Sequence, residues 1–426
     1  MTTNGFMTLS DLMGRNVLVL GLGREGKAAM DCLARLVPTA KVLGADDNTL
    51  YASVSLEDAV RQAADDTVVI KSPGIPPTHP CFELLNKRAL PVTSSTDLFF
   101  HERKRKRCVI AITGTKGKST TASLLAHTLR TAGLPVELVG NIGVPSLARV
   151  DALEDTIFVC ETSSYQAMDV TVGPDICVVL NLYAEHMDYH GGVDAYWNAK
   201  LNLVRRQREG DVYIYDSRFS LLVDTAREVE SESIACNDFS SSAIDLLPLF
   251  GEHNRENARA VVAVARRFEV SEDVLETAFR SFQPLPHRLE PVGEVGGVLF
   301  VNDSISTVPQ AAMAAMSAFE GKLGALIVGG KDRGYDFSEL AQVLTKCPDT
   351  LVFVLPGGEH MQEEFKAHGV AYQAVSGLSE AVEACVARVP SGRVCLLSPA
   401  SPSYGFFKNF EDRGDQFRVL VGRHSP

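Results

Sequence analysis

A lysine and several hydroxyl groups lie close together in a glycine-rich run of the chain, Thr113-Gly114-Thr115-Lys116-Gly117-Lys118-Ser119-Thr120-Thr121. In such a run the ammonium group of Lys118 can neutralise phosphate charge, and the hydroxyl of Ser119 can bind a magnesium ion. Only two residues separate Gly114 from Gly117, whereas the common phosphate loop has four at that place. We interpret the run as a nucleoside triphosphate site. The alternative is a glycine-rich turn that binds nothing.

The elements on either side of this run support a phosphate site. The apolar residues 108–112 predict a buried strand before it. After it, apolar residues at i, i+3, i+4 and i+7 predict a helix; they are Ala122, Leu125, Ala126 and Leu129. A helix that begins directly after a strand and a glycine loop points free N–H groups and the positive end of its dipole at an anion.

A second glycine-rich turn, Gly21–Gly26, follows the predicted strand Asn16–Leu20 and opens another helix. The next predicted strand, Lys41–Ala45, ends at Asp46 and Asp47. This order is typical of a dinucleotide-binding fold, with a nucleotide diphosphate on the first turn and an acidic residue near the ribose or base. The alternative is an α/β domain whose glycines serve only close packing.

Two polar residues follow other predicted strands. Glu161 comes after the apolar run 157–160 and can hold magnesium directly or through water; a helix-start acid is the alternative. His186 follows the strand 176–180 beside two acidic residues. It can bind a second metal ion or orient a reacting group, or it is an ordinary surface histidine.

Three further positions have weaker signals. Lys200 is predicted to lie on a helix, where a single lysine is normally solvated. Asn254 and Asn257 precede a predicted helix, Ala258–Arg267, and their three-residue spacing places both amides on one side. They suit an adenine edge, or they cap the helix. Arg288 is expected at a hinge, where it can clamp a γ-phosphate when domains close.

Strands alternate with helices along the whole chain, which predicts parallel, right-handed βαβ units and an α/β fold class. The 426 residues allow several domains. We predict three: a Rossmann-like N-terminal domain at 1–104, a central P-loop ATPase domain at 105–288 and a Rossmann-like C-terminal domain at 289–426.

Composition excludes several classes of protein. A hydrophobic content of 45% and a charged content of 22% are ordinary for a soluble globular protein. The net charge of -12 argues against non-specific nucleic-acid binding as the main activity. Nine cysteines, an odd number without a Cys-x-x-Cys pair, predict reduced thiols in a cytoplasmic protein. Neither a signal peptide nor a membrane span is expected.

Taken in order, these motifs resemble the Mur ligases, ATP-dependent enzymes that form amide bonds in peptidoglycan precursor synthesis. The resemblance covers all three predicted domains, and the ordered set is highly specific although each motif alone is not. It rests on Thr113–Thr121, Gly140–Gly143, Glu161–Ser164, Glu185–Asp188, Ala199-Lys200, His253–Asn257, His287-Arg288 and Asn302–Ser304. The runs Gly329–Gly334, Leu397–Ala400 and Phe407–Gly414 are similar to the member that adds glutamate.

This resemblance implies an ATP-dependent, ADP-forming ligase that joins glutamate to UDP-N-acetylmuramoyl-L-alanine through an acyl phosphate. It implies a cytoplasmic monomer, two Mg²⁺ sites and a carbamoylated lysine. The implied ATP-site residues are Gly114, Thr115, Lys116, Gly117, Lys118, Ser119, Thr120, Asn254, Asn257, Arg288 and Asp303. The implied metal-site residues are Ser119, Glu161, His186 and Lys200, and the implied catalytic residues are Lys118, His186 and Lys200. Carbamoylation would turn Lys200 into a hard oxygen ligand, which replaces its interpretation as a solvated lysine.

The resemblance also assigns substrate sites. In the first domain and near it, the UDP-substrate residues would be Gly23, Arg24, Glu25, Ser72 and Asn141. In the C-terminal domain, the glutamate-binding residues would be Thr307, Arg333, Ser403 and Phe410.

Two positions depart from the family pattern. Ile305 stands in Asp303-Ser304-Ile305-Ser306-Thr307, where glutamate-adding enzymes usually have Asp-Ser-Lys-Ala-Thr. D-glutamate is the family default, but Ile305 resembles a branch that adds L-glutamate and relies on a separate epimerase. Inverting the α-carbon moves the carboxylates, so a different charge pattern is expected there. Lys116 stands where the family usually has asparagine.

Two other functions compete with this interpretation. A folylpolyglutamate-type ligase shares the phosphate loop and the lysine, but should lack the complete Gly-x-Gly-x-x-Gly first domain. The second competing function is that of a non-catalytic nucleotide-binding protein with the same fold. The presence of Lys118, Glu161, His186 and Lys200 together argues against it.

Overall fold

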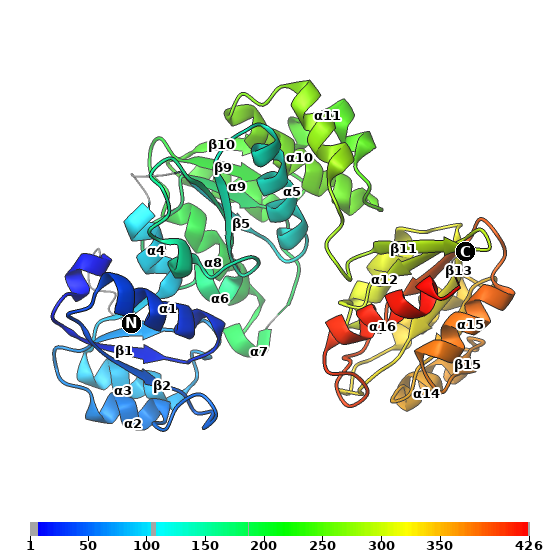
Figure 1. Cartoon of the computed structure of the whole chain (residues 1–426), viewed down its shortest axis with the longest axis horizontal. Coiled ribbons are helices and arrows are strands. Elements are labelled where there is room, and N and C mark those ends of the chain that lie inside the picture. Colours follow the sequence, from blue (N-terminus) through cyan, green and yellow to red (C-terminus); the bar gives the residue numbers. More distant parts are fainter. Residues whose placement is uncertain (1–6, 104–107, 186, 425–426) are drawn as a thin grey trace. The chain divides into compact units, whose positions relative to one another are not determined.

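The computed structural model of the protein describes residues 7–103, 108–185 and 187–424. They form three sheets combined with helices (Figure 1). By its internal contacts the chain separates into two compact units. Unit 1 comprises residues 1–247 and 255–282, and unit 2 comprises residues 248–254 and 283–426. Unit 1 therefore contains the first two sheets and unit 2 contains the third.

The first sheet is parallel and has the strand order β2-β1-β3-β4. Its elements are β1 (Asn16–Leu20), α1 (Arg24–Leu36), β2 (Lys41–Ala45), α2 (Leu56–Gln62), β3 (Val68–Lys71), α3 (Pro80–Arg88), β4 (Val92–Ser94) and α4 (Ser95–Arg103). Successive side chains of a strand point to opposite faces. Val17 and Val19 accordingly pack in the core that contains residues of α1 and α4, while Leu18 and Leu20 pack with α2 and α3.

The second sheet is also parallel, with the order β10-β9-β8-β5-β7-β6. Its strands are β5 (Val109–Thr113), β6 (Val136–Gly140), β7 (Ile157–Glu161), β8 (Ile176–Val179), β9 (Val212–Tyr215) and β10 (Glu232–Ala235). Its helices are α5 (Lys118–Thr131), α6 (Ser164–Ala167), α7 (Met187–His190), α8 (Val193–Arg205), α9 (Ser220–Glu228), α10 (Glu252–Arg267) and α11 (Glu272–Ser281). The strand order reverses at β5, and ligands of open α/β sheets bind outside the carboxyl ends of the strands at such a point.

The third sheet has the order β11-β12-β16-β13-β14-β15. Its elements are β11 (Glu290–Val295), β12 (Val298–Asn302), α12 (Pro309–Ser317), β13 (Leu323–Val328), α13 (Ser338–Thr345), β14 (Leu351–Val354), α14 (Glu359–Ala367), β15 (Gln373–Ala374), α15 (Leu378–Arg388), β16 (Val394–Leu397) and α16 (Phe410–Gly422). One hydrophobic core joins the sheet to α12, α13 and α14, and another joins it to α15 and α16. The sheet is thus covered by helices on both faces, which is the Rossmann-like arrangement expected from the sequence.

Most predicted strands are present within one or two residues of their expected bounds, and the α/β fold class is confirmed. Two expectations were wrong. Helix α10 begins at Glu252 rather than at Ala258, so Asn254 and Asn257 lie inside it and do not precede it. Strand β11 runs antiparallel to β12, whereas parallel units were expected throughout. The domain bounds near 104 and 288 stay predictions, and residues 104–107 lie outside the described part of the chain.

All nine cysteines are unpaired, and all except Cys108 and Cys347 are buried. Burial raises the pKa of the Cys160 thiol to about 12 and that of Cys236 to about 12, so these groups stay protonated at neutral pH. Among the described residues, no helix is both long enough and apolar enough to cross a membrane.

Candidate functional site

The phosphate-loop motif lies where the strand order of the second sheet reverses. The loop leaves β5 after Thr113 and leads into α5, which begins at Lys118. Gly117 has a left-handed backbone (φ 86°), and a Cβ there would lie 2.3 Å from Oδ1 of Asn257. Glycine is therefore required at this position, and the amide of Asn257 lies directly against the loop. The structure thus brings two predicted ATP-site residues, Gly117 and Asn257, together.

Two lysine side chains converge on one backbone carbonyl of this loop. Nζ of Lys118 donates to the carbonyl oxygens of Gly114 (3.0 Å) and Thr115 (2.8 Å). Nζ of Lys200, on α8, donates to the same Gly114 oxygen at 2.8 Å. Lys200 is 1% exposed. Burial, and next the charge of Lys118, lower the pKa of Lys200 to about 6, so Lys200 is largely a neutral amine at pH 7.

The loop is also held by residues that the sequence did not single out. Asn181, just after β8, accepts from the N–H of Lys116 through Oδ1 (2.8 Å), and its carbonyl accepts from the N–H of Thr115 (2.9 Å). The hydroxyl of Tyr196 donates to Oγ1 of Thr115 at 3.2 Å, and its ring lies 4.6 Å from Nζ of Lys200. Asn181 is a polar residue at the carboxyl end of a buried strand, which is the same signal that pointed to Glu161.

Glu161 is the last residue of β7 and is 1% exposed. Its Oε1 accepts from the side-chain amide of Asn141 at 2.9 Å. Its Oε2 is buried and has no hydrogen-bond partner among the described residues, and the same holds for the hydroxyl of Thr113. An unsatisfied buried carboxylate oxygen is costly unless something binds it. Oε2 of Glu161 and the hydroxyl of Ser119 are both hard oxygen donors, which is the kind of ligand that Mg²⁺ requires.

The predicted metal set is only partly visible. His186 lies outside the described residues. Within the described part of the chain, no group of three or more His, Cys, Asp or Glu side chains is arranged to hold a metal ion. The second predicted magnesium site therefore stays a prediction that depends on His186 and on carbamoylation of Lys200.

The first glycine turn is tightly built. The hydroxyl of Ser72 donates to the carbonyl of Gly21 at 2.6 Å. A Cβ on Gly26 would lie 1.9 Å from that same carbonyl oxygen, so only glycine fits where α1 approaches the turn. Asp46 accepts from the N–H groups of Leu22 and Asn48, with one oxygen each. The carboxylate of Asp46 therefore braces the turn.

Two predicted substrate residues of α1 contact the second sheet. The guanidinium of Arg24 donates to the carbonyl oxygens of Asn141 and Gly143. The carboxylate of Glu25 accepts from the amide of Gln166 at 3.1 Å, and burial raises its pKa. Gly23 is the N-cap of the same helix and offers no side chain. The structure therefore gathers Gly23, Arg24, Glu25 and Asn141 at one place in unit 1, close to Glu161.

Three predicted ATP-site residues belong to unit 2. The amide of Asn254 donates to the carbonyl of Phe250 at 2.7 Å. Asp303 is buried after β12, where one carboxylate oxygen accepts from Ser398 (2.8 Å) and the other from the N–H of Leu289 (3.2 Å). Burial raises the pKa of Asp303 to about 6 although these hydrogen bonds oppose the shift. Arg288 is half-buried, precedes Leu289 in the chain and lowers the pKa of Asp303 electrostatically.

The predicted glutamate residues lie in loops at the carboxyl ends of the third sheet. Thr307 follows β12, Arg333 follows β13, Ser403 follows β16, and Phe410 begins α16. Ser403 is buried, and Arg333 is exposed with its guanidinium 5.9 Å from the ring of Tyr404. Ile305, the residue that departs from the family, is half-buried in the loop after β12.

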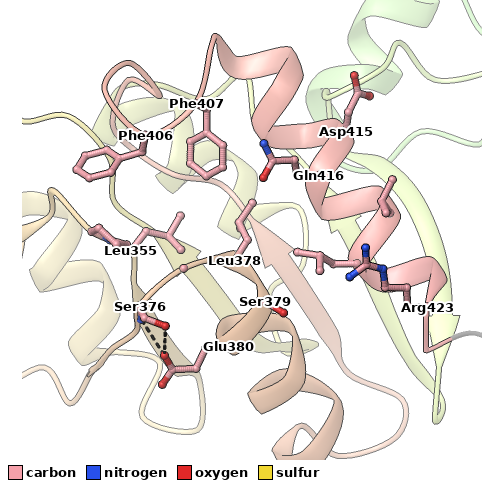
Figure 2. Close-up of a pocket in the computed structure, with 14 residues that line it drawn as sticks. Leu355, Ser376, Leu378, Ser379, Glu380, Phe406, Phe407, Asp415, Gln416 and Arg423 are labelled. Atoms are coloured by element: carbon pink, nitrogen blue, oxygen red, sulfur yellow. Dashed lines mark hydrogen bonds between the residues drawn. The ribbon is translucent and has the colours of Figure 1, made fainter.

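A cavity of about 690 Å³ lies in unit 2. Figure 2 shows that Phe406 and Phe407 line it from the loop before α16, Gln416 lines it from α16, and Leu378 lines it from the start of α15. None of the predicted glutamate residues is part of its lining. The cavity borders one of them, because the N–H groups of Phe406 and Phe407 donate to the carbonyl of Ser403 at 3.3 and 3.1 Å.

Comparison with known proteins agrees with this arrangement. Residues 112–243 match the model of the Mur ligase middle domain, and residues 287–401 match the model of the Mur ligase glutamate ligase domain. A UDP-N-acetylmuramoyl-L-alanine–L-glutamate ligase of Micromonospora sp. is 35% identical, over 97% of this chain and 98% of that protein. A UDP-N-acetylmuramoylalanine–D-glutamate ligase of Streptococcus agalactiae is 32% identical, over 96% of this chain and 97% of that protein.

Solved structures share the fold at low sequence identity. The MurF ligase of Thermotoga maritima, in complex with ADP, has a TM-score of 0.60 at 15% identity and covers 98% of this chain and 97% of its own. FolC of E. coli, in complex with DHPP and ADP, has a TM-score of 0.56 at 18% identity and covers 78% of this chain and 93% of its own.

Proposed function

Because the chain belongs to the Mur ligase family, we propose that it is the ATP-dependent, ADP-forming ligase that adds glutamate to UDP-N-acetylmuramoyl-L-alanine. The observation that carries this proposal is the relationship to glutamate ligases of that substrate over 96–97% of the chain. The reaction belongs to peptidoglycan precursor synthesis. We place it in the cytoplasm, where ATP and UDP-linked precursors are found, and we expect the protein to act as a monomer.

We further propose that the acceptor is L-glutamate, with D-glutamate as the second candidate. The relatives from Micromonospora and Salinispora tropica, at 35% and 36% identity, are named L-glutamate ligases, whereas the Streptococcus relative at 32% is named a D-glutamate ligase. Ile305 supports the same choice, because it replaces the cation expected beside a bound D-glutamate. A neutral side chain there suits a different placement of the two carboxylates.

The reaction would proceed in two steps. The alanine carboxylate attacks the γ-phosphorus of ATP, forming the acyl phosphate and releasing ADP. The neutral amine of glutamate then attacks the acyl carbon and loses a proton, and phosphate leaves from the tetrahedral intermediate as the amide forms. Lys118 and the N-terminus of α5 offset the charge that develops on the transferred phosphoryl group.

Lys200 is proposed to carry a carbamate. An uncharged amine attacks carbon dioxide, forms the N–C bond and loses a proton, which leaves a carbamate anion. The burial of Lys200 and its approach to Lys118 favour this reaction, since both disfavour the protonated amine. The carbamate product places a negative charge near the cation of Lys118, and this contact is attractive.

Mg²⁺ is the other proposed cofactor. Ser119, Glu161, His186 and the carbamate of Lys200 would hold two ions. Oε2 of Glu161, which has no hydrogen-bond partner among the described residues, supports this assignment. When bound, Mg²⁺ neutralises phosphate charge and polarises the transferred group. Asn141, which donates to Oε1 of Glu161, keeps the remaining carboxylate oxygen oriented.

A folylpolyglutamate-type activity is less well supported. The FolC structure covers only 78% of this chain, and the complete Gly21–Gly26 turn is present. A non-catalytic role leaves the burial of Lys200 and the unpartnered Glu161 oxygen without a purpose.

The test is phosphate release and product mass with purified protein, ATP, Mg²⁺ and UDP-N-acetylmuramoyl-L-alanine, with D- and L-glutamate in separate reactions. Turnover with L-glutamate and a product heavier by one glutamyl residue is the expected result. Turnover with D-glutamate only would keep the ligase and remove Ile305 from the argument. Phosphate release with neither enantiomer, or release without a heavier product, would contradict the proposed function.

A further inference from the structure

Arg413 is a fully buried cation in the first turn of α16, with 0% of the residue exposed. An arginine there faces the positive end of the helix dipole, which is unfavourable. Its hydrogen-bond acceptors in the described structure are backbone carbonyls and one hydroxyl, and none is a carboxylate. Burial lowers its pKa to about 9, so the group still carries its charge at neutral pH. An apolar side chain would fill this space at a lower desolvation cost.

The guanidinium distributes its donors over three loops. Nε donates to the hydroxyl of Ser304 at 3.0 Å, and Nη2 donates to the carbonyl of Ser304 at 2.9 Å. Nη1 donates to the carbonyl of Ser401 at 3.1 Å and, more weakly, to that of Gly329 at 3.4 Å. These loops leave the carboxyl ends of β12, β16 and β13, which are neighbours in the sheet. One side chain therefore joins three loops, which are also linked by backbone hydrogen bonds from Ala400 to Ser306 (2.9 Å) and from Lys331 to Pro402 (2.8 Å).

The packing around this group leaves little freedom. A Cβ on Gly330 would lie 2.4 Å from the carbonyl oxygen of Pro402 and 3.2 Å from Nη1 of Arg413. The hydroxyl of Ser304 also donates to the carbonyl of Phe410 at 2.8 Å, which ties the start of α16 to the same point. The loops after β13 and β16 are thus pressed against the guanidinium.

Each tied segment carries one of the residues proposed to bind glutamate. Thr307 lies three residues after Ser304, Arg333 four residues after Gly329, and Ser403 two residues after Ser401. Phe410 is tied through its own carbonyl. A dicarboxylate is recognised only when its partners keep a fixed spacing, and a misplacement of about 1 Å can cost on the order of 100-fold in rate.

We propose that Arg413 is a positioning residue for glutamate, which sets the mutual spacing of the groups that bind the two carboxylates without touching the substrate itself. This inference rests on the proposed function, through the assignment of Thr307, Arg333, Ser403 and Phe410 to glutamate. The carboxylate of Asp303, proposed for ATP, accepts from Ser398 and from the N–H of Leu289, and neither hydrogen bond involves Arg413. Loss of the Arg413 contacts should therefore act on glutamate before it acts on ATP.

The test compares Arg413→Lys and Arg413→Met with the wild-type enzyme. KM is measured for glutamate, ATP and the UDP-linked substrate separately, and the acyl phosphate is trapped with hydroxylamine in the absence of glutamate. We expect KM for glutamate to rise about tenfold or more in both variants, since several charge-assisted hydrogen bonds are lost. KM for the other two substrates should stay within about twofold, and trapping should persist. The lysine variant should be milder but not normal, because one ammonium cannot reach three loops.

Two further variants keep the test decisive. Arg423→Met removes an exposed arginine at the end of the same helix and should leave all three KM values unchanged. Ser304→Ala removes only the hydroxyl that bridges Arg413 and Phe410. This variant replaces Arg413→Met in the test if Arg413→Met does not fold. It should raise KM for glutamate by a smaller factor in the same direction.

The outcomes separate the two proposals. Equal rises in all three KM values with a lower Tm would make Arg413 a structural residue only and overturn the inference. Unchanged KM values in both Arg413→Lys and Ser304→Ala would also overturn the inference. The proposed function would still stand in that case if the wild-type enzyme turns over glutamate. If the wild-type enzyme forms the acyl phosphate but turns over neither glutamate enantiomer, the proposed function fails and this inference fails with it.

Discussion

Lys200 in unit 1 and Arg413 in unit 2 are both buried basic residues that donate to backbone carbonyls at the carboxyl ends of parallel strands. Burial has different consequences for the two. It lowers the pKa of Lys200 to about 6, with Lys118 adding to the effect, and lowers that of Arg413 to about 9. At pH 7 the lysine is mostly a neutral nucleophile and the arginine is still a charged donor. The same kind of environment therefore supplies a reactive group in one unit and a fixed framework in the other.

The largest effect should come from Lys118, the cation of unit 1 that must keep its charge. Lys118→Ala should lower ATP-dependent amide formation by about 100- to 1,000-fold, because one preorganised contact to the transferred phosphoryl group is lost. Initial rates of phosphate release measure this. Arg130→Ala, an exposed residue in the last turn of α5, is the matched control. A Lys118→Ala enzyme with normal amide formation would contradict the mechanism.

Lys200→Ala should also lose activity, and short carboxylic acids should partly restore it by replacing the carbamate. Rates with and without added acetate measure the recovery, and Arg205→Met on the same helix is the control. Absence of recovery would leave the carbamate role without support.

Removal of the Lys200 amine should lower activity but raise the stability of the folded protein. The folded pKa of Lys200, about 6, lies below its ordinary value of 10.5, so the unfolded chain binds more protons between these pH values. Folding then costs free energy at pH 7, and this cost falls as the pH rises toward 10.5. Lys200→Met should therefore have a higher Tm than wild type in the metal-free protein at pH 7, and a smaller difference at pH 9. A lower Tm at pH 7 would contradict the assignment of a destabilising buried amine.

A substitution at Ile305 tests whether a cation at this position of unit 2 changes the choice between D- and L-glutamate. Ile305→Lys should raise the ratio of D- to L-glutamate turnover roughly fivefold, since a partly exposed charge pair is worth about 1 kcal/mol. Competition between isotopically distinct enantiomers measures the ratio, and Ile305→Leu is the control. An unchanged ratio would remove Ile305 from the discrimination.

The smallest effect is expected from Lys116, whose side chain is 54% exposed and pairs with Glu185 at 2.6 Å. Lys116→Asn should change KM for ATP by less than about threefold, because exposed ion pairs contribute little. Titration of ATP at saturating concentrations of the other substrates measures it. A larger change would show that the exposed ammonium of Lys116 contributes to phosphate binding, as the half-buried Lys118 is proposed to do.

Local patterns were enough to predict most of the fold. Apolar runs such as Asn16–Leu20 and Leu323–Val328 are buried strands because a strand covered on both faces needs an apolar side chain at nearly every position. Strand β11 was missed because Pro291 and Gly293 interrupt its pattern and produce a bulge against β12. The start of α10 was placed too late because asparagines more often flank a helix than begin its interior.

The phosphate loop, the glycine turn and Glu161 were recognisable because each is a short run whose chemistry depends on neighbours in the sequence. The state of Lys200 and the role of Arg413 depend on partners 86 and 109 residues away, Gly114 and Ser304. A residue type states which group is available, but its pKa and its hydrogen bonds follow from burial and from the charges that the fold brings near it. Residue types and short spacings therefore supplied the chemistry of this protein. Only the tertiary structure decided which basic side chain is neutral and able to react, and which one stays charged and holds its surroundings in place.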